Sequence, residues 1–140
     1  MGKINIGRVI LGVLVAGIVS DILGYLVDGI WLAPRWDEGN KALGLANISS
    51  NQVIWYNVLG LAGGLALIWL YAAIRPRFGA GVNTAICAGL VYWFVGVLLP
   101  NLSFMWVGHL YSHHLTAYTT AGALVEVVVA AIAGAALYKE

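Results

Sequence analysis

The chain has 140 residues, of which 61% are hydrophobic and only 9% are charged, and its mean hydropathy is +0.89. About a quarter of the residues in an ordinary soluble domain are charged, so this composition excludes a soluble globular protein. A formal net charge of +1, without any Lys/Arg cluster, excludes the broad basic surface that nucleic-acid binding requires. The single cysteine, Cys87, excludes an intrachain disulfide and a paired-cysteine redox or zinc motif.

Four apolar stretches fill nearly the whole chain, and each is long enough to cross a hydrocarbon core of ~30 Å. A polar loop over residues 33–52 joins the first two and has room for a small ordered element. Arg75-Pro76-Arg77 with Gly79 and Gly81 predicts a tight turn before the third. We therefore predict an all-α integral membrane four-helix bundle that forms a single transmembrane domain over residues 1–140. The predicted spans cover residues 9–31, 53–74, 82–104 and 115–137.

The cations predict the orientation of the bundle. Cytoplasmic loops carry an excess of Lys and Arg, and five of the seven cations fall on one side of the predicted membrane. Both termini are therefore expected in the cytoplasm and the loop 33–52 outside. The five are Lys3, Arg8, Arg75, Arg77 and Lys139, against Arg35 and Lys41 on the other side.

Two carboxyl groups are predicted near the middle of the membrane. Asp21 is thirteen residues from Arg8, and Glu126 is thirteen from Lys139. At a rise of ~1.5 Å per residue, both lie ~20 Å from the cytoplasmic boundary, at one level on the first and last helices. Tyr92 of the third span lies at this level too, and its phenol can donate to a carboxylate. We expect these three side chains to approach one another.

Small and acidic residues recur at helical spacing in the first and last spans. Positions three and four residues apart share one face of a helix, and small residues let helices approach closely in a membrane. These faces are therefore expected to contact protein and not lipid. They comprise Gly17, Asp21, Gly24 and Asp28 in the first span, and Gly122, Glu126, Ala130 and Gly134 in the last.

A second polar layer is predicted nearer the outer surface, within about one helical turn of the same depth. It comprises Asp28, Asn57, Asn101 and Tyr118 with Thr119. Pro100 precedes Asn101 and removes the hydrogen bond to the carbonyl of Gly96, so we expect a kink beside a polar cavity. Together with the deeper carboxyls, this layer predicts a polar cavity that opens outward.

Carboxyl groups inside a membrane favour two functional hypotheses. Low polarity disfavours the ionised form, and two carboxyls in contact titrate as one coupled unit that shares a proton. The leading hypothesis is a protein that binds or transports a small ligand or cation, with proton linkage through Asp21 and Glu126. The competing hypothesis is a structural or assembly subunit whose polar stripes only pack helices, within one chain or in a homo-oligomer.

Three histidines between the third and fourth spans suggest a third hypothesis. His109 and His113 have i, i+4 spacing, which on a helix places two imidazoles on one face, and His114 follows directly. Such residues ligate zinc or haem iron. The alternative interpretation is that they are ordinary interfacial histidines beside aromatic residues. No protease, hydrolase or phosphate-loop motif occurs, so the sequence gives no support for an enzyme.

The segment Gly29-Ile30-Trp31-Leu32-Ala33-Pro34-Arg35-Trp36 resembles the end of the first span in a family of small four-span bacterial membrane proteins of unknown function. These proteins are similar in a Gly-x-x-Trp-x-x-Pro motif, a second Trp shortly after it and a Gly/Ala-rich last span. The chain departs from the family at Leu32, where a Tyr is expected. The resemblance implies a bacterial inner-membrane protein with four spans, and it implies no activity.

Overall fold

The computed structural model describes residues 6–46 and 48–138, and these residues form an all-α bundle, as the sequence predicted. Its helices include three segments with wider, π-helical turns, labelled η. In chain order the elements are α1 (Ile6–Gly24), η1 (Tyr25–Trp31), α2 (Ala33–Ala42), α3 (Ser50–Phe78), α4 (Val82–Trp93), η2 (Phe94–Leu98), α5 (Leu99–Ser103), η3 (Phe104–Gly108) and α6 (His113–Leu137).

Among the described residues, four continuous helices are long and apolar enough to cross a membrane. The chain is therefore a small integral membrane protein with a four-helix transmembrane bundle. Each helix includes one of the apolar stretches delimited in the sequence and extends beyond it on at least one side. The helices run over Ile6–Trp31, Ser50–Phe78, Val82–Gly108 and His113–Leu137.

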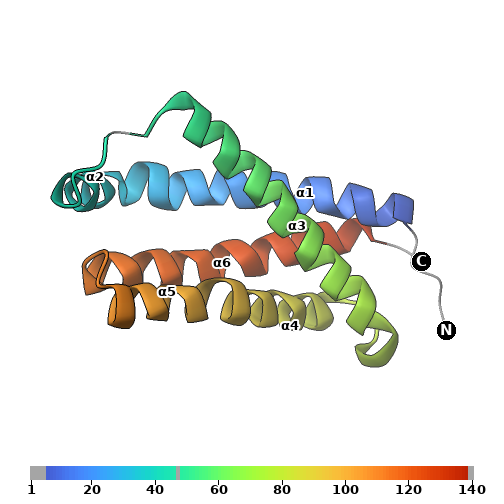
Figure 1. The fold of residues 1–140 in the computed structure, drawn as a ribbon. Helices are drawn as coiled ribbons and strands as arrows, with labels where there is room; N and C mark the ends of the chain where they lie inside the picture. The colour runs from blue at the N-terminus through green and yellow to red at the C-terminus, as the bar shows by residue number, and fades with distance from the viewer. Residues whose placement is uncertain (1–5, 47, 139–140) are drawn as a thin grey trace.

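The start of α1 and the end of α6 lie at the same end of the bundle, which we call the terminal end, and α2 lies at the other, the α2 end (Figure 1). Helix α1 packs against α3 and α6, and α4 packs against α6 and α3. Whereas α1, α4 and α6 run roughly along one direction, α3 crosses them obliquely (Figure 1). Helix α1 therefore packs against both α3 and α6, which also contact each other.

Two glycine pairs set how closely α1 meets its neighbours. A Cβ added at Gly64 of α3 would lie 2.9 Å from the backbone nitrogen of Gly17. A Cβ added at Gly12 would lie 2.9 Å from the carbonyl oxygen of Gly134 on α6. The helix backbones are thus in direct contact, which only residues without a side chain permit.

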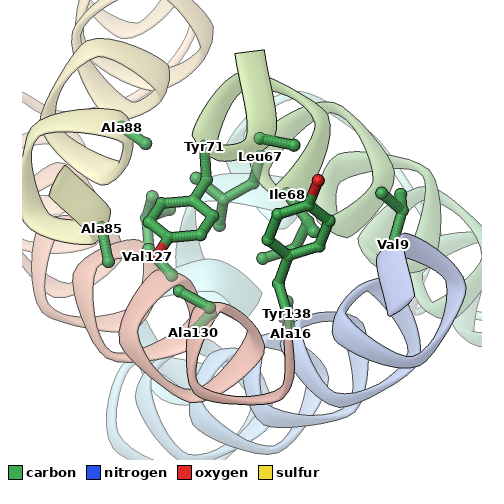
Figure 2. Packing of buried hydrophobic residues seen from close by; sticks show 13 residues of the cluster. Val9, Ala16, Leu67, Ile68, Tyr71, Ala85, Ala88, Val127, Ala130 and Tyr138 are labelled. Atoms are coloured by element: carbon green, nitrogen blue, oxygen red, sulfur yellow. The ribbon is translucent and has the colours of Figure 1, made fainter. Parts of the chain in front are cut away.

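The buried core is formed by residues of α1, α3, α4 and α6 together with Tyr138, and Figure 2 shows how their side chains pack. Small alanines bring the four helices together, and two tyrosine rings fill the space that remains. The rings of Tyr71 and Tyr138 pack edge to face with centroids 6.0 Å apart, and the guanidinium of Arg75 lies 5.2 Å from the centre of the Tyr138 ring. The core alanines are Ala16, Ala72, Ala85, Ala88, Ala130, Ala131 and Ala135.

The turn predicted between the second and third spans lies at its two glycines and not at residues 75–77. Helix α3 continues through Pro76 to Phe78, and the chain reverses at Gly79 and Gly81, which have φ values of 85° and 138°. A proline in the last helical turn removes only one backbone hydrogen bond, whereas positive φ is readily available to glycine. The turn therefore follows the glycines and not the proline.

The third membrane-crossing helix contains the irregularity expected at Pro100. The segment η2 ends just before α5, and the backbone N–H of Leu99 bonds to the carbonyl of Phe94, five residues earlier. Such wider turns accommodate a residue that cannot donate a backbone hydrogen bond. The helix continues past the proline as α5.

The loop between α1 and α3 contains the short helix α2, which begins with Pro34 near its first position. Leu32, directly before it, is fully buried, as is Leu115 at the start of α6. Trp36 and Tyr111 pack edge to face at 5.0 Å. Helix α2 is therefore packed onto the start of α6.

The Gly17–Gly64 contact makes the first testable prediction. Gly64→Val places side-chain atoms against the backbone of α1, which cannot move away without separating the helices. We expect a loss of ~1–3 kcal/mol or more in the free energy of unfolding, the usual cost of overpacking. Denaturation in detergent, followed by circular dichroism and gel filtration, measures it.

Gly96→Ala is the matched control, because a Cβ there meets only the Tyr92 ring at an ordinary contact distance of 3.8 Å. Equal stability of Gly64→Val and Gly96→Ala would contradict the assigned role of the glycine crossing.

Candidate functional site

Glu126 is an acidic residue that lies between two helices of the bundle. It lies on α6, and the hydroxyl of Ser20 on α1 donates to its Oε1 at 2.5 Å. A Cβ added at Gly24 would lie 3.4 Å from its Oε2, so the glycine leaves space for the carboxylate. The Ser20–Glu126 hydrogen bond thus joins the two helices in the middle of the membrane-crossing region.

The stripe predicted on the last span faces α1, but the stripe predicted on the first span divides: Gly24 and Asp28 face α6, whereas Gly17 and Asp21 face α3. Starting from the Gly12–Gly134 contact, the pairs follow one another along the antiparallel helices towards the α2 end. The pairs are Gly12 with Gly134, Ser20 with Glu126, Val27 with Gly122, and Asp28 with Thr119. Tight packing and polar contacts therefore belong to one continuous interface.

Asp21 lies beside this interface but faces α3. Its carboxyl rests on the backbone of Gly60, in the space where a Cβ would otherwise stand. The side chain is partly exposed. Asp21 and Glu126 are close enough to interact electrostatically, while the hydrogen bond to Glu126 comes from Ser20. The two acids expected to meet are thus neighbours at one level, with Asp21 on the face of α1 that meets α3 and Glu126 on α6.

A cavity of about 140 Å³ lies next to these acids, between α1, α3, the third membrane helix and α6. Glu126 and Ser20 line it on one side and Tyr92 on the other. The phenol of Tyr92 lies close to the backbone of Gly63, since a Cβ there would be only 2.6 Å from its oxygen. Glycines on α3 therefore create the space into which the polar groups point, and Gly60, Gly63 and Gly64 all line it.

Asp28 forms the acidic contact nearest the α2 end. Its Oδ1 accepts hydrogen bonds from Thr119 of α6 at 2.8 Å and from the indole of Trp36 of α2 at 3.0 Å. It also interacts electrostatically with Glu126. Beside it, the guanidinium of Arg35 stacks 5.0 Å above the ring of Tyr118. Asp28 thus holds α2 against α6.

Of the predicted outer layer, Thr119 meets Asp28, whereas Asn57 and Asn101 lie elsewhere. Asn57 is exposed on α3 and donates to the carbonyl of Val53 on its own helix at 2.7 Å. Asn101 donates to the hydroxyl of Thr120 at 2.8 Å, on a side of α6 that faces the third helix. The structure does not bring Asp28, Asn57 and Asn101 together, because α3 diverges from α1 and the contact of Asn101 faces away from Asp28.

The histidines adopt no helical i, i+4 arrangement. His109 has a φ of 48° where the third helix ends, and His113 begins α6 with its ring 5.0 Å from that of Trp106. Within residues 6–46 and 48–138, no three His, Cys, Asp or Glu side chains are grouped so that they could hold a metal ion. The i, i+4 spacing of His109 and His113 therefore does not correspond to one helical face.

Ser20 and Trp36 contribute to the site although sequence reasoning did not single them out. Ser20 belongs to the repeat Gly12, Ala16, Ser20 and Gly24, four residues apart, which is a small-residue helix-packing pattern that could have revealed it. The sequence could not identify Trp36 as a partner of Asp28, because only the folding of α2 onto the bundle brings its indole to that carboxyl.

Comparison with known proteins adds no relative: no protein-family model, no curated protein and no solved structure matches the chain. The resemblance of Gly29–Trp36 to small four-span bacterial proteins therefore stays a prediction. The site has to be interpreted from its own chemistry.

The Asp28–Trp36 bond makes the second prediction. Trp36→Phe keeps the aromatic packing but removes the donor, and a hydrogen bond to a charged group contributes about 1.5–3 kcal/mol. We expect amide hydrogen exchange over residues 33–42 to become at least about tenfold faster, since 1.4 kcal/mol is a factor of ten. Mass spectrometry of the exchanged protein measures it.

Glu38→Gln changes an exposed residue of the same helix and is the control. Unchanged exchange in Trp36→Phe would show that Asp28 does not hold α2.

Proposed function

We propose that this small membrane protein binds a monovalent inorganic cation in competition with protons at the Glu126 cavity. The observation that carries the proposal is the carboxylate of Glu126, which faces the cavity with only neutral hydrogen-bond partners around it. Three acids, Asp21, Asp28 and Glu126, lie within the membrane-crossing helices. The hydroxyl of Ser20 donates to Glu126, and the hydroxyl of Thr119 and the indole of Trp36 donate to Asp28.

The charge of these acids has no basic counterpart along the spans. No Lys or Arg occurs between residues 9 and 34, 42 and 74, or 78 and 138. Several carboxylates close together in a medium of low polarity cannot all stay ionised without a compensating positive charge. A bound proton or a bound cation supplies that charge, and the two compete for the same oxygen atoms.

The size of the cavity favours a small occupant. Sites for drug-sized ligands are typically ~300–1,000 Å³, and a cavity needs only ~10–15 Å³ to hold a water molecule. At about 140 Å³ the cavity accommodates an ion with a few water molecules and excludes a large organic cation. Carboxylate, phenol and hydroxyl oxygens are suitable ligands for hard cations.

We propose further that both termini face the cytoplasm of a bacterial inner membrane and that the cation enters from the α2 end. Among the described residues, Arg8, Arg75 and Arg77 lie towards the terminal end, and Arg35 and Lys41 on α2. This distribution supports the positive-inside orientation. Lys3 and Lys139, which contribute to the same argument, lie outside the described residues.

The test uses purified protein reconstituted in lipid nanodiscs, with Na⁺ or K⁺ as the added ligand. Binding in competition with protons releases protons, which a pH-sensitive dye detects in weakly buffered solution. The cation should also raise the thermal midpoint of the wild-type protein, because a ligand that binds only the folded state stabilises it. Glu126→Gln keeps the shape of the side chain and should abolish both effects.

Glu38→Gln makes the same chemical change on the exposed surface of α2 and should behave as wild type. If neither cation releases protons from the wild-type protein nor shifts its thermal midpoint, the cation-binding proposal is wrong.

A second candidate function is supported by the Ser20–Glu126 hydrogen bond itself. It links α1 and α6 at the centre of a glycine-rich interface, as expected if Glu126 only fastens helices in a structural or assembly subunit. In that case Glu126→Gln retains the hydrogen bond and changes neither cation response nor proton release, whereas Ser20→Ala lowers stability.

A further inference from the structure

The first half of α3 is exposed around its whole circumference. All residues from 50 to 59, here called the projecting segment, are exposed. The consecutive residues Ile54, Trp55 and Tyr56 point to different sides, and 60%, 64% and 62% of their surfaces are accessible. In Figure 1 this part of α3 extends beyond α1. Within the described residues, no other element covers it.

One face of the projecting segment continues an interface that is already buried. Further along α3, Gly64, Leu67 and Tyr71 are buried against the rest of the bundle. Alternating steps of three and four residues extend this stripe backwards to Gly60, Asn57 and Val53. Such spacing keeps one face of a helix directed at a partner helix. The packing face of α3 therefore extends beyond the part that other helices of the same chain cover.

Asn57 makes this uncovered face unsuitable for lipid. It lies inside a helix that is apolar and long enough to cross the membrane. Its amide nitrogen donates to the carbonyl of Val53, which leaves the amide oxygen and a second N–H available. Polar groups without partners are costly in hydrocarbon. An amide both donates and accepts, so an identical amide can satisfy it.

Asp21 lies under the same face, one helical turn away. Its carboxyl rests on Gly60, the next residue of the stripe, and is partly exposed. A carboxyl group near the middle of a membrane is expected to face protein or water and not lipid. The side chain of Asp21 is thus left partly uncovered where α3 diverges from α1.

We propose that the projecting segment pairs with the same segment of a second copy of this chain, with Asn57 bonded to Asn57 of the partner, and that this pairing covers Asp21. A two-fold axis parallel to the bundle brings equal residues to equal depth, so the interface is self-complementary. A single Asn in the core of such a stripe specifies a dimer and fixes its register. The dimer is independent of cation binding and goes beyond it.

Disulfide cross-linking in membranes tests the proposal. Cys87 on α4 is first replaced by Ser, and one cysteine is introduced at Val53, on the stripe, or at Trp55, on the opposite face of the same turn. Both positions are exposed and lie at nearly the same depth. With copper phenanthroline, Val53→Cys should yield a species of twice 14.9 kDa and Trp55→Cys should not.

Adding Asn57→Leu to the Val53→Cys protein should reduce the cross-linked fraction about threefold to tenfold, the range expected for one polar contact between membrane helices. Equal yields at positions 53 and 55, or no cross-link at 53, would overturn the proposal, because lipid would then cover the segment. Glu126→Gln in the same protein should leave the yield unchanged, which separates failure of the dimer from failure of cation binding.

Discussion

The direct backbone contact of α1 with two neighbouring helices is the constraint on which the rest of the structure depends. Lipid is as apolar as leucine, so helices in a membrane gain little from burying hydrophobic area and associate through close packing. Gly17 against Gly64 and Gly12 against Gly134 provide that packing. A side chain at any of these positions would separate α1 from α3 or α6.

The same contacts position the acids. Because α1 and α6 touch at Gly12 and Gly134, Ser20 comes within hydrogen-bond distance of Glu126 further along the interface, and Thr119 reaches Asp28 beyond it. Because α3 carries glycines where it crosses α1, space remains beside Glu126 for a small cavity. Packing and a polar site are therefore two results of one pattern of small residues, which is why a packing role and a cation-binding role have to be separated by experiment.

Charge distinguishes this interface from simple packing. Helices can be joined by hydrogen bonds between neutral hydroxyl and amide groups alone, as between Asn101 and Thr120. A stripe that only packs helices needs no carboxyl groups. The α1–α6 interface instead has two carboxyls, with a third, Asp21, beside it, and no Lys or Arg occurs between residues 9 and 34 or between 78 and 138. That excess of acidic residues supports the proposal that a proton or a cation binds exchangeably in the Glu126 cavity.

The sequence by itself determined the all-α membrane bundle and the small-residue stripe by which α6 meets the first helix, because apolar length and helical spacing are local properties of the chain. It also placed Asp21 and Glu126 at one level, since depth follows from residue counts along a helix. The tertiary structure alone decided which neighbouring helix each acid faces, and it gave the partner of Glu126 as Ser20. It also separated Asn57 and Asn101 from Asp28, as depth along a helix does not specify direction around it. The crossing of α3 over α1 fixes those directions, and counting residues cannot reveal it.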